Sequence, residues 1–280
     1  MTAFSTAPLP GPFGLEVSNI NLITMVDADL KELLLMLYAN RFLVLRTGGL
    51  SKQEFVTFAR RVGDPIQLSN NEEYPEFASL TNIDTDTRVE KRGAAHWHSD
   101  QSFTKHRSSV TMLYSVQAPK SSGETRFCDL TAAYETLPED RRQLIDELIV
   151  EHRLGVSVAA RPGDHIPIPP KGWDQSRSVF HPLVREHPVT GLRTLYAITG
   201  TSQGIQSMPL DDAVRLLTEL CEHAFQDQFV TSHRHAVNDL VMWGNPTTLH
   251  SASPIGAATG PDDTRVIHRI SLKGTPSVFT

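Results

Sequence analysis

The stretch at residues 94–103 reads AAHWHSDQSF and contains two candidate metal ligands, His98 and Asp100. In a β-strand, side chains two residues apart point to the same face, so this pair would project together. One imidazole and one carboxylate supply two ligands of the 2-His-1-carboxylate site, which binds iron(II) and leaves the opposite positions open. A His-x-Asp pattern also arises by chance in a polar turn, so the rest of the chain decides its meaning.

Composition indicates one large globular domain. The 280 residues are 39% hydrophobic and 21% charged, which is enough apolar material for a sizeable core. The formal net charge is −6 and there is no basic run, so we expect no nucleic-acid partner. The longest apolar run near the start, residues 33–39, is far shorter than the ~20 residues that a membrane span needs. We therefore expect no membrane association.

The N-terminus and the cysteines indicate the setting of the domain. Residues 1–12 hold three prolines and no basic segment followed by an apolar one, so they predict a flexible arm and no secretory signal. A single domain over 13–280 would follow. Only two cysteines, Cys128 and Cys221, are present, so no disulfide framework is implied and we expect a cytoplasmic protein.

Hydrophobic periodicity predicts many short strands and few helices. Helices are expected at 27–40, at 51–62 behind a Ser51/Glu54 capping box, at 138–151 and at 210–225. Strands are expected at 13–17, 42–45, 77–81, 110–116, 125–130, 179–187, 192–198, 229–236, 239–243, 247–250 and 265–272. Strands and helices do not alternate regularly, so we expect a mostly β protein with added α: a double-stranded β-helix (jelly roll) core with flanking helices.

One segment resists regular structure. Residues 161–172 are rich in proline and glycine, which predicts a loop insertion at about 155–178. Long loops of this kind are either lids over a pocket or surface excursions, and the sequence leaves both open.

A third ligand and two arginines occur near the C-terminus. His250 ends an apolar strand and turn, and a jelly roll brings such distant strands together, although one of 12 histidines carries little weight by position alone. Arg265 and Arg269 share one face of the last strand. An inward-facing arginine needs an anion, and its planar fork suits a carboxylate. A solvated edge strand with outward arginines fits the same pattern.

These features occur together in a recognisable order. In these features the chain resembles the iron(II)/2-oxoglutarate-dependent dioxygenases of the taurine dioxygenase/2,4-dichlorophenoxyacetate dioxygenase family. The matching features are residues 97–100, Thr125, residues 239–243 before His250, and the Arg265-x-x-x-Arg269 pair. The resemblance runs from about Gly14 to Gly274. Residues 97–103 and 127–134 look like the phenoxyacetate branch, whereas residues 265–269 look like the taurine and alkylsulfatase branch.

The resemblance implies a role for each matching position. His98, Asp100 and His250 would hold iron(II), and Thr125 and Arg265 would hold the distal carboxylate of 2-oxoglutarate. In the substrate site, Arg269 would face an acidic group and Phe103 would line the apolar part. Trp243 would lie beside the metal site. The resemblance is also compatible with a homo-oligomer.

Some positions depart from the family pattern. Gly244 stands where the family commonly has aspartate in Trp-Asp-Asn, so a carboxylate near the metal site is missing. The segment 253–261 is longer than in the taurine enzyme, residues 67–71 contain no histidine, and residues 94–96 lack the polar groups that contact taurine. These departures argue against taurine as substrate and leave the iron site intact.

The implied function is hydroxylation of a C–H bond in a small, acidic organic substrate. Dioxygen and 2-oxoglutarate would be consumed as cosubstrates, and succinate and carbon dioxide released. Asp100 favours hydroxylation over halogenation, because related halogenases need that position for chloride. Hydroxylation beside a heteroatom would cleave aryloxy acids, sulfonates or sulfate esters. The alternatives are a biosynthetic tailoring oxygenase (hydroxylation or desaturation), a jelly-roll hydrolase or isomerase with a redox-inactive metal, and a metal-free binding module.

Overall fold

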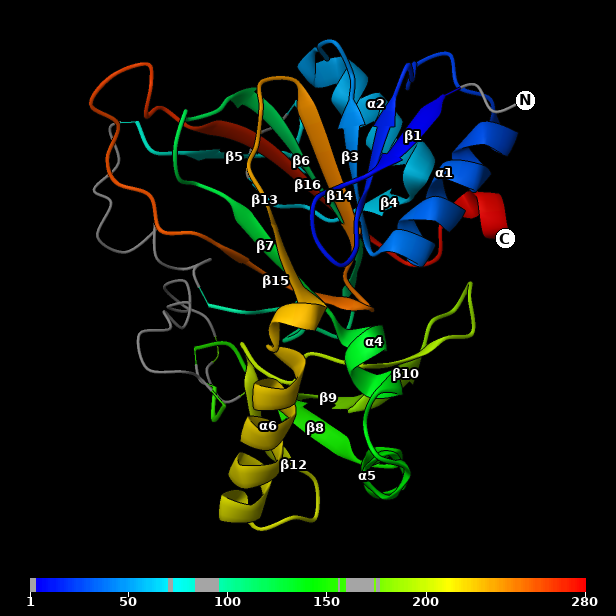
Figure 1. Ribbon diagram of the computed structural model, residues 1–280, viewed down its shortest axis with the longest axis vertical. Coiled ribbons are helices and arrows are strands. Elements are labelled where there is room, and N and C mark those ends of the chain that lie inside the picture. Colours follow the sequence, from blue (N-terminus) through cyan, green and yellow to red (C-terminus); the bar gives the residue numbers. More distant parts are fainter. Residues whose placement is uncertain (1–3, 70–72, 84–95, 156, 160–173, 175–176) are drawn as a thin grey trace.

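The computed structural model describes residues 4–69, 73–83, 96–155, 157–159, 174 and 177–280, and these form a jelly roll with flanking helices (Figure 1). The expected fold class is thereby confirmed. Two sheets make up the jelly roll, and a further lobe of short strands and helices lies below them in Figure 1.

The major sheet contains strands from both ends of the chain. Its order is β1 (Ser5–Pro8), β2 (Leu15–Ser18), β3 (Phe42–Arg46), β14 (Asp239–Gly244), β6 (Ser108–Gln117), β16 (Val266–Lys273) and β4 (Asp64–Pro65), with β5 (Ala78–Thr81) also paired to β16. Every residue of β14 is buried, because other layers cover both faces of this central strand. The sheet thus brings Arg269 of β16, and Arg265 just before it, alongside β6 from the middle of the chain.

Two helices cover the outer face of the major sheet. In α1 (Asp27–Asn40), Leu30, Leu33, Leu34 and Leu37 are buried at helical spacing, in one core cluster with residues of β3, β6 and β14. Helix α2 (Lys52–Val62) begins with the expected capping box: Glu54 N donates to Ser51 Oγ at 3.2 Å, and Ser51 N donates to the Glu54 carboxylate at 2.8 Å. Both helices lie on the same side of the molecule in Figure 1.

The minor sheet packs against the inner face of the major sheet. Its order is β13 (Val230–His233), β7 (Thr125–Asp129) and β15 (Thr248–Ala252), all antiparallel. A core cluster joins the two sheets, and in it Phe42 of β3 stacks on Phe127 of β7 with ring centroids 4.3 Å apart. On β15, His250 lies beside the major sheet, with its ring centroid 4.6 Å from that of Trp243 in β14.

The lower lobe has its own apolar core. It contains α4 (Leu130–Glu135), α5 (Glu139–Ile145), α6 (Leu210–Ala224), a sheet of β12 (Ser202–Ile205), β8 (Ile149–His152) and β9 (Val179–Pro182), and the hairpin of β10 (Val184–Glu186) and β11 (Arg193–Leu195). Short 3₁₀ helices, η1 (Asp227–Phe229) and η2 (Ser277–Phe279), complete the described elements. Among the described residues, no helix combines the length and apolar character that crossing a bilayer requires.

The structure differs from the expected elements at two places. The helix expected over 138–151 is wrong in its second half, because the β-branched pair Ile149 and Val150 belongs to β8, between β9 and β12. The expected flexible arm is corrected at residues 5–8, which form strand β1 at the edge of the major sheet. Pro8, which has no N–H group, is tolerated in an edge strand. Most of the expected insertion at about 155–178, including 161–172, lies outside the described residues.

Replacing Ser51 by alanine tests the cap of α2. The variant should lose about 1 kcal/mol of unfolding free energy and roughly 2 °C in Tm, because the amide of Glu54 loses its acceptor. Thermal unfolding followed by circular dichroism measures both. Thr57→Ala, at an exposed position in the same helix, is the control and should lose nothing; equal losses in the two variants would contradict the capping contribution.

Candidate active site

Three side chains form a cluster able to bind a metal ion. The potential ligand atoms of His98, Asp100 and His250 all lie within 4.8 Å of one another. Asp100 Oδ1 is 3.7 Å from Nε2 of His98 and 3.7 Å from Nε2 of His250. The two distances from Asp100 are below twice a typical metal–ligand distance of ~2.1 Å, and the three side chains together have the spacing of a group that could hold one metal ion. Two imidazoles and one carboxylate are the donor set that suits iron(II).

A pair of backbone hydrogen bonds holds the two histidines together. His98 N donates to His250 O at 3.0 Å, and His250 N donates to His98 O at 2.9 Å. The segment around His98 is this isolated antiparallel bridge rather than the regular strand expected, and Asp100 lies in the turn that follows. His98 and Asp100 therefore approach one another because a bridge leads into a turn, and not through strand alternation.

Both histidines are neutral near pH 7. Burial and the neighbouring His250 lower the pKa of His98 to about 3, and burial lowers the pKa of His250 to about 4. His98 Nδ1 lies 3.0 Å from the carbonyl oxygen of His96. As a donor to that oxygen, Nδ1 carries the ring proton and leaves the lone pair of Nε2 for a metal.

Hydrogen bonds and a neighbouring positive charge hold the Asp100 carboxylate in its ionised form. Thr111 Oγ1 donates to Oδ2 at 2.6 Å, and Arg269 Nη2 donates to Oδ1 at 2.8 Å. Burial by itself would raise the pKa of Asp100, but the charge of Arg269 above all, with the Thr111 hydroxyl, holds this pKa below its ordinary value. The carboxylate therefore stays available as an anionic ligand.

Asn245 organises the support of Asp100. Its Oδ1 accepts from Asp100 N at 3.1 Å and Trp243 Nε1 at 3.3 Å, and its Nδ2 donates to Thr111 Oγ1 at 2.9 Å. Since the Thr111 oxygen accepts from Asn245, its own proton is directed to Asp100. Although Gly244 supplies no carboxylate, the next residue, Asn245, supports Asp100. Sequence reasoning missed Asn245 and Thr111, although Asn245 matches the last residue of the Trp-Asp-Asn pattern noted at Gly244.

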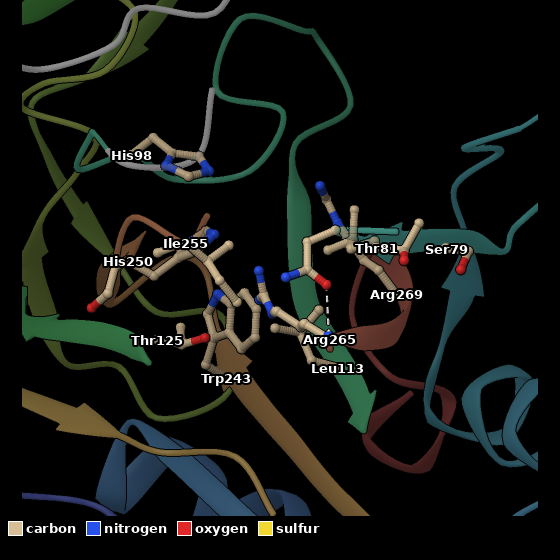
Figure 2. A pocket seen from close by; sticks show the side chains of 14 residues that line it. Ser79, Thr81, His98, Leu113, Thr125, Trp243, His250, Ile255, Arg265 and Arg269 are labelled. Carbon is tan, nitrogen blue, oxygen red and sulfur yellow. Dashed lines mark hydrogen bonds between the residues drawn. The ribbon is translucent and has the colours of Figure 1, made fainter. Parts of the chain in front are cut away.

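The histidines open onto a cavity of about 460 Å³ (Figure 2). Its lining comes mainly from the major sheet, β7, β15 and the segment before β16, and consists of Ser79, Leu80, Thr81, Asn82, His98, Leu113, Thr125, Trp243, His250, Ala252, Ser253, Ile255, Arg265 and Arg269. Trp243 lies beside the metal cluster as expected, its ring centroid 4.6 Å from that of His250. Thr125, Arg265 and Arg269 are all brought to this cavity. Phe103, half-buried in the turn after Asp100, is not among the described lining residues.

Arg265 brings an uncompensated positive charge to the cavity. Its Nε is buried without a hydrogen-bond partner in the described structure. Burial lowers the pKa of Arg265 to about 10, and no described acid contributes to the shift. A guanidinium whose Nε is buried without a partner is costly unless an anion joins it.

The backbone of Arg265 is fixed by a residue that sequence reasoning missed. Arg265 N donates to Asn82 Oδ1 at 2.7 Å, while Asn82 Nδ2 donates to Gly256 O at 3.0 Å and Asp263 O at 2.9 Å. The long segment noted at 253–261 is therefore tied to the end of β5, and its Ile255 forms part of the cavity wall.

A jelly roll that presents two histidines, a carboxylate and an unpaired arginine around one cavity has the features of a metal-dependent oxygenase with room for an acidic cosubstrate. Comparison with known proteins agrees. Residues 5–271 match the family described as "Taurine catabolism dioxygenase TauD, TfdA family", and the chain belongs to this family.

Individual relatives cover nearly the whole chain. The sequence is 33% identical to the alpha-ketoglutarate-dependent 2,4-dichlorophenoxyacetate dioxygenase of Cupriavidus pinatubonensis, over 87% of this chain and 90% of the relative. It is 32% identical to pentalenolactone F synthase of Streptomyces arenae, over 94% and 93%. The crystal structure of AAD-2 in complex with Mn(II) and N-oxalylglycine superposes with a TM-score of 0.78 at 26% identity, covering 98% of both chains.

These findings fix the class of activity. The protein is a non-haem, iron(II)- and 2-oxoglutarate-dependent dioxygenase that acts on a small molecule. The prediction from sequence of an oxygenase is confirmed, in preference to a hydrolase, an isomerase or a metal-free binding module.

Replacing Thr111 by valine tests the support of Asp100. The variant keeps the volume of the side chain but removes the donor to Oδ2, so Mn(II) affinity should fall roughly 10- to 100-fold. Titration followed by the electron paramagnetic resonance signal of free Mn(II) measures it. Ser109→Ala is the control and should keep the wild-type Mn(II) affinity. It also removes a hydroxyl from β6, but Ser109 Oγ donates to Leu272 O of β16 and not to Asp100. Wild-type affinity in Thr111→Val would show that the hydroxyl does not support the site.

Proposed function

We propose that His98, Asp100 and His250 hold iron(II), and that Thr125 and Arg265 bind the distal carboxylate of 2-oxoglutarate. The observation that carries this proposal is the uncompensated Arg265 guanidinium in the same cavity as both histidines. A dicarboxylate that reaches from the metal cluster to Arg265 would supply the missing anion. The Thr125 hydroxyl adds a hydrogen bond to that charge-assisted contact.

The chain's own residues position the reactants and exclude water. When bound, iron(II) and 2-oxoglutarate activate dioxygen, so that a substrate C–H becomes C–OH while 2-oxoglutarate becomes succinate and carbon dioxide. The neutral imidazoles and the ionised Asp100 hold the metal without a prior proton loss. Trp243, Leu113 and Ile255 give the cavity apolar walls that keep water from the reacting groups.

For the substrate we propose a small organic acid whose anionic group binds Arg269. In the structure, Arg269 uses Nη2 for Asp100 and Nε for Ser271 Oγ at 3.3 Å, which leaves Nη1 without a hydrogen bond to a described residue. One guanidinium can therefore contact the metal ligand and an anion in the cavity together. Phe103 is proposed to line the apolar part of the substrate site.

Two physiological roles fit this site. Hydroxylation next to a heteroatom would cleave an aryloxy acid, sulfonate or sulfate ester, and the similarity to the 2,4-dichlorophenoxyacetate enzyme favours such a catabolic role. The similarity to pentalenolactone F synthase favours a biosynthetic tailoring role as the second candidate. A cytoplasmic location is supported by the low cysteine content, since the only two cysteines of the sequence, Cys128 and Cys221, are both buried. A homo-oligomer stays a prediction.

Anaerobic addition of iron(II) and 2-oxoglutarate tests the metal and cosubstrate assignment. The wild type should develop a visible charge-transfer band, because 2-oxoglutarate chelates the bound iron. His98→Ala and Asp100→Ala should lose the band, since each removes a ligand. After admission of air, each substrate oxidised should release one succinate. A colourless wild-type mixture would refute the assignment.

Substitution of Arg269 by glutamine tests the anionic substrate. Turnover of a panel of small carboxylates and sulfonates, scored by succinate, first identifies an acidic substrate and its neutral amide or ester. Arg269→Gln should reduce kcat/KM for the acid roughly 30-fold or more and leave the neutral compound nearly unchanged, because only the acid loses an ion pair. The charge-transfer band of the variant controls for damage to Asp100. Equal losses for both compounds would contradict a direct contact.

A further inference from the structure

His235, which follows β13, is a buried histidine with both ring nitrogens hydrogen-bonded. Its Nε2 lies 2.9 Å from Thr125 Oγ1, and its Nδ1 lies 3.0 Å from Ser115 Oγ. The residue is only 5% exposed, while Ser115 is fully buried and Thr125 nearly so. A continuous chain of hydrogen bonds therefore runs from β6, through the imidazole, to a hydroxyl at the cavity wall.

The surroundings of His235 keep it uncharged. Burial is the main cause that holds the pKa of His235 well below its usual range; His233 and the Arg265 guanidinium act in the same direction, against a smaller opposing effect of Asp239. A neutral imidazole has one N–H donor and one acceptor nitrogen. The two neighbouring hydroxyls must therefore play opposite roles, one donating to the ring and the other accepting from it.

An anion in the cavity decides between the two directions of this chain. If Thr125 donated to His235, the hydroxyl would present only lone pairs to a carboxylate. If Ser115 donates to Nδ1 and Nε2–H donates to Thr125, the Thr125 proton is free to donate into the cavity. The second arrangement satisfies every group in the chain, and successive hydrogen bonds polarise one another in the same direction.

We propose that His235 is a positioning residue for 2-oxoglutarate: it donates from Nε2 to Thr125 Oγ1 and thereby directs the Thr125 proton to the distal carboxylate. This inference rests on the proposed role of Thr125 and Arg265. It explains why a histidine is buried next to Arg265, where its charged form is disfavoured. The contribution is specific to cosubstrates that carry a distal carboxylate.

The test compares 2-oxoglutarate with 2-oxopentanoate, which has the same keto acid end and a methyl group in place of the distal carboxylate. Dissociation constants come from anaerobic titration of the iron(II) protein followed by the charge-transfer band. His235→Phe should raise Kd for 2-oxoglutarate roughly 10- to 100-fold, the range for a hydrogen bond to a charged group, and leave Kd for 2-oxopentanoate unchanged. His235→Gln should restore much of the affinity, because its amide can donate to Thr125.

Two further variants separate positioning from a structural effect. His268→Phe is the matched control, a buried histidine on β16 whose ring packs on Phe77 at 4.3 Å, and it should leave both constants unchanged. Ser115→Ala removes the far end of the chain and should weaken 2-oxoglutarate alone, by a smaller factor. It keeps the test decisive should His235→Phe fail to fold.

A double-mutant cycle with Thr125→Val shows whether His235 acts through Thr125. In the Thr125→Val background, His235→Phe should have little further effect on 2-oxoglutarate binding. The inference is overturned if His235→Phe weakens both keto acids equally, or if its effect is undiminished in that background. A wild type that binds 2-oxoglutarate no better than 2-oxopentanoate, or a Thr125→Val variant with wild-type affinity, would instead overturn the proposed cosubstrate site on which the inference rests.

Discussion

The reciprocal hydrogen bonds between the backbones of His98 and His250 are the constraint on which the site depends. They join a segment of irregular backbone to β15, and they place both imidazoles and the Asp100 carboxylate within reach of one ion. The bridge is supported by the two sheets. Strand β15 pairs with β7, and Phe127 of β7 stacks on Phe42 of β3. The three clustered ligand side chains are thus anchored to the core between the two sheets.

Charge distribution makes the cavity unlike the rest of the protein. The chain carries a formal net charge of −6, yet the described groups at the site are two neutral histidines, one ionised Asp100, and the guanidinium groups of Arg265 and Arg269. Arg269 is paired with Asp100, whereas Arg265 has no described acid beside it. A divalent metal would add further positive charge. Such a site suits the dicarboxylate cosubstrate, and its positive charge supports the proposal of an anionic substrate.

Uncharged polar side chains from distant parts of the chain set the directions of the hydrogen bonds around these charges. Asn245 orients Thr111 toward Asp100, and Asn82 fixes the backbone of Arg265. His235 has the same relation to Thr125. In each case a buried group gives its neighbour a defined donor or acceptor role, which a site that must bind anions and a metal in a fixed geometry requires.

The sequence by itself determined the strands and helices with strong periodicity, the cap at Ser51, and the three clustered ligands with Thr125 and the two arginines beside them, because short patterns and family motifs record those features. Tertiary structure alone decided that residues 149–152 pair as a strand, that His98 lies on an isolated bridge, and that Phe103 is absent from the described lining. It also brought Asn82, Thr111, Ser115 and His235 to the site. Hydrogen bonds between residues far apart in the chain leave no periodic pattern, so only the packed sheets reveal them.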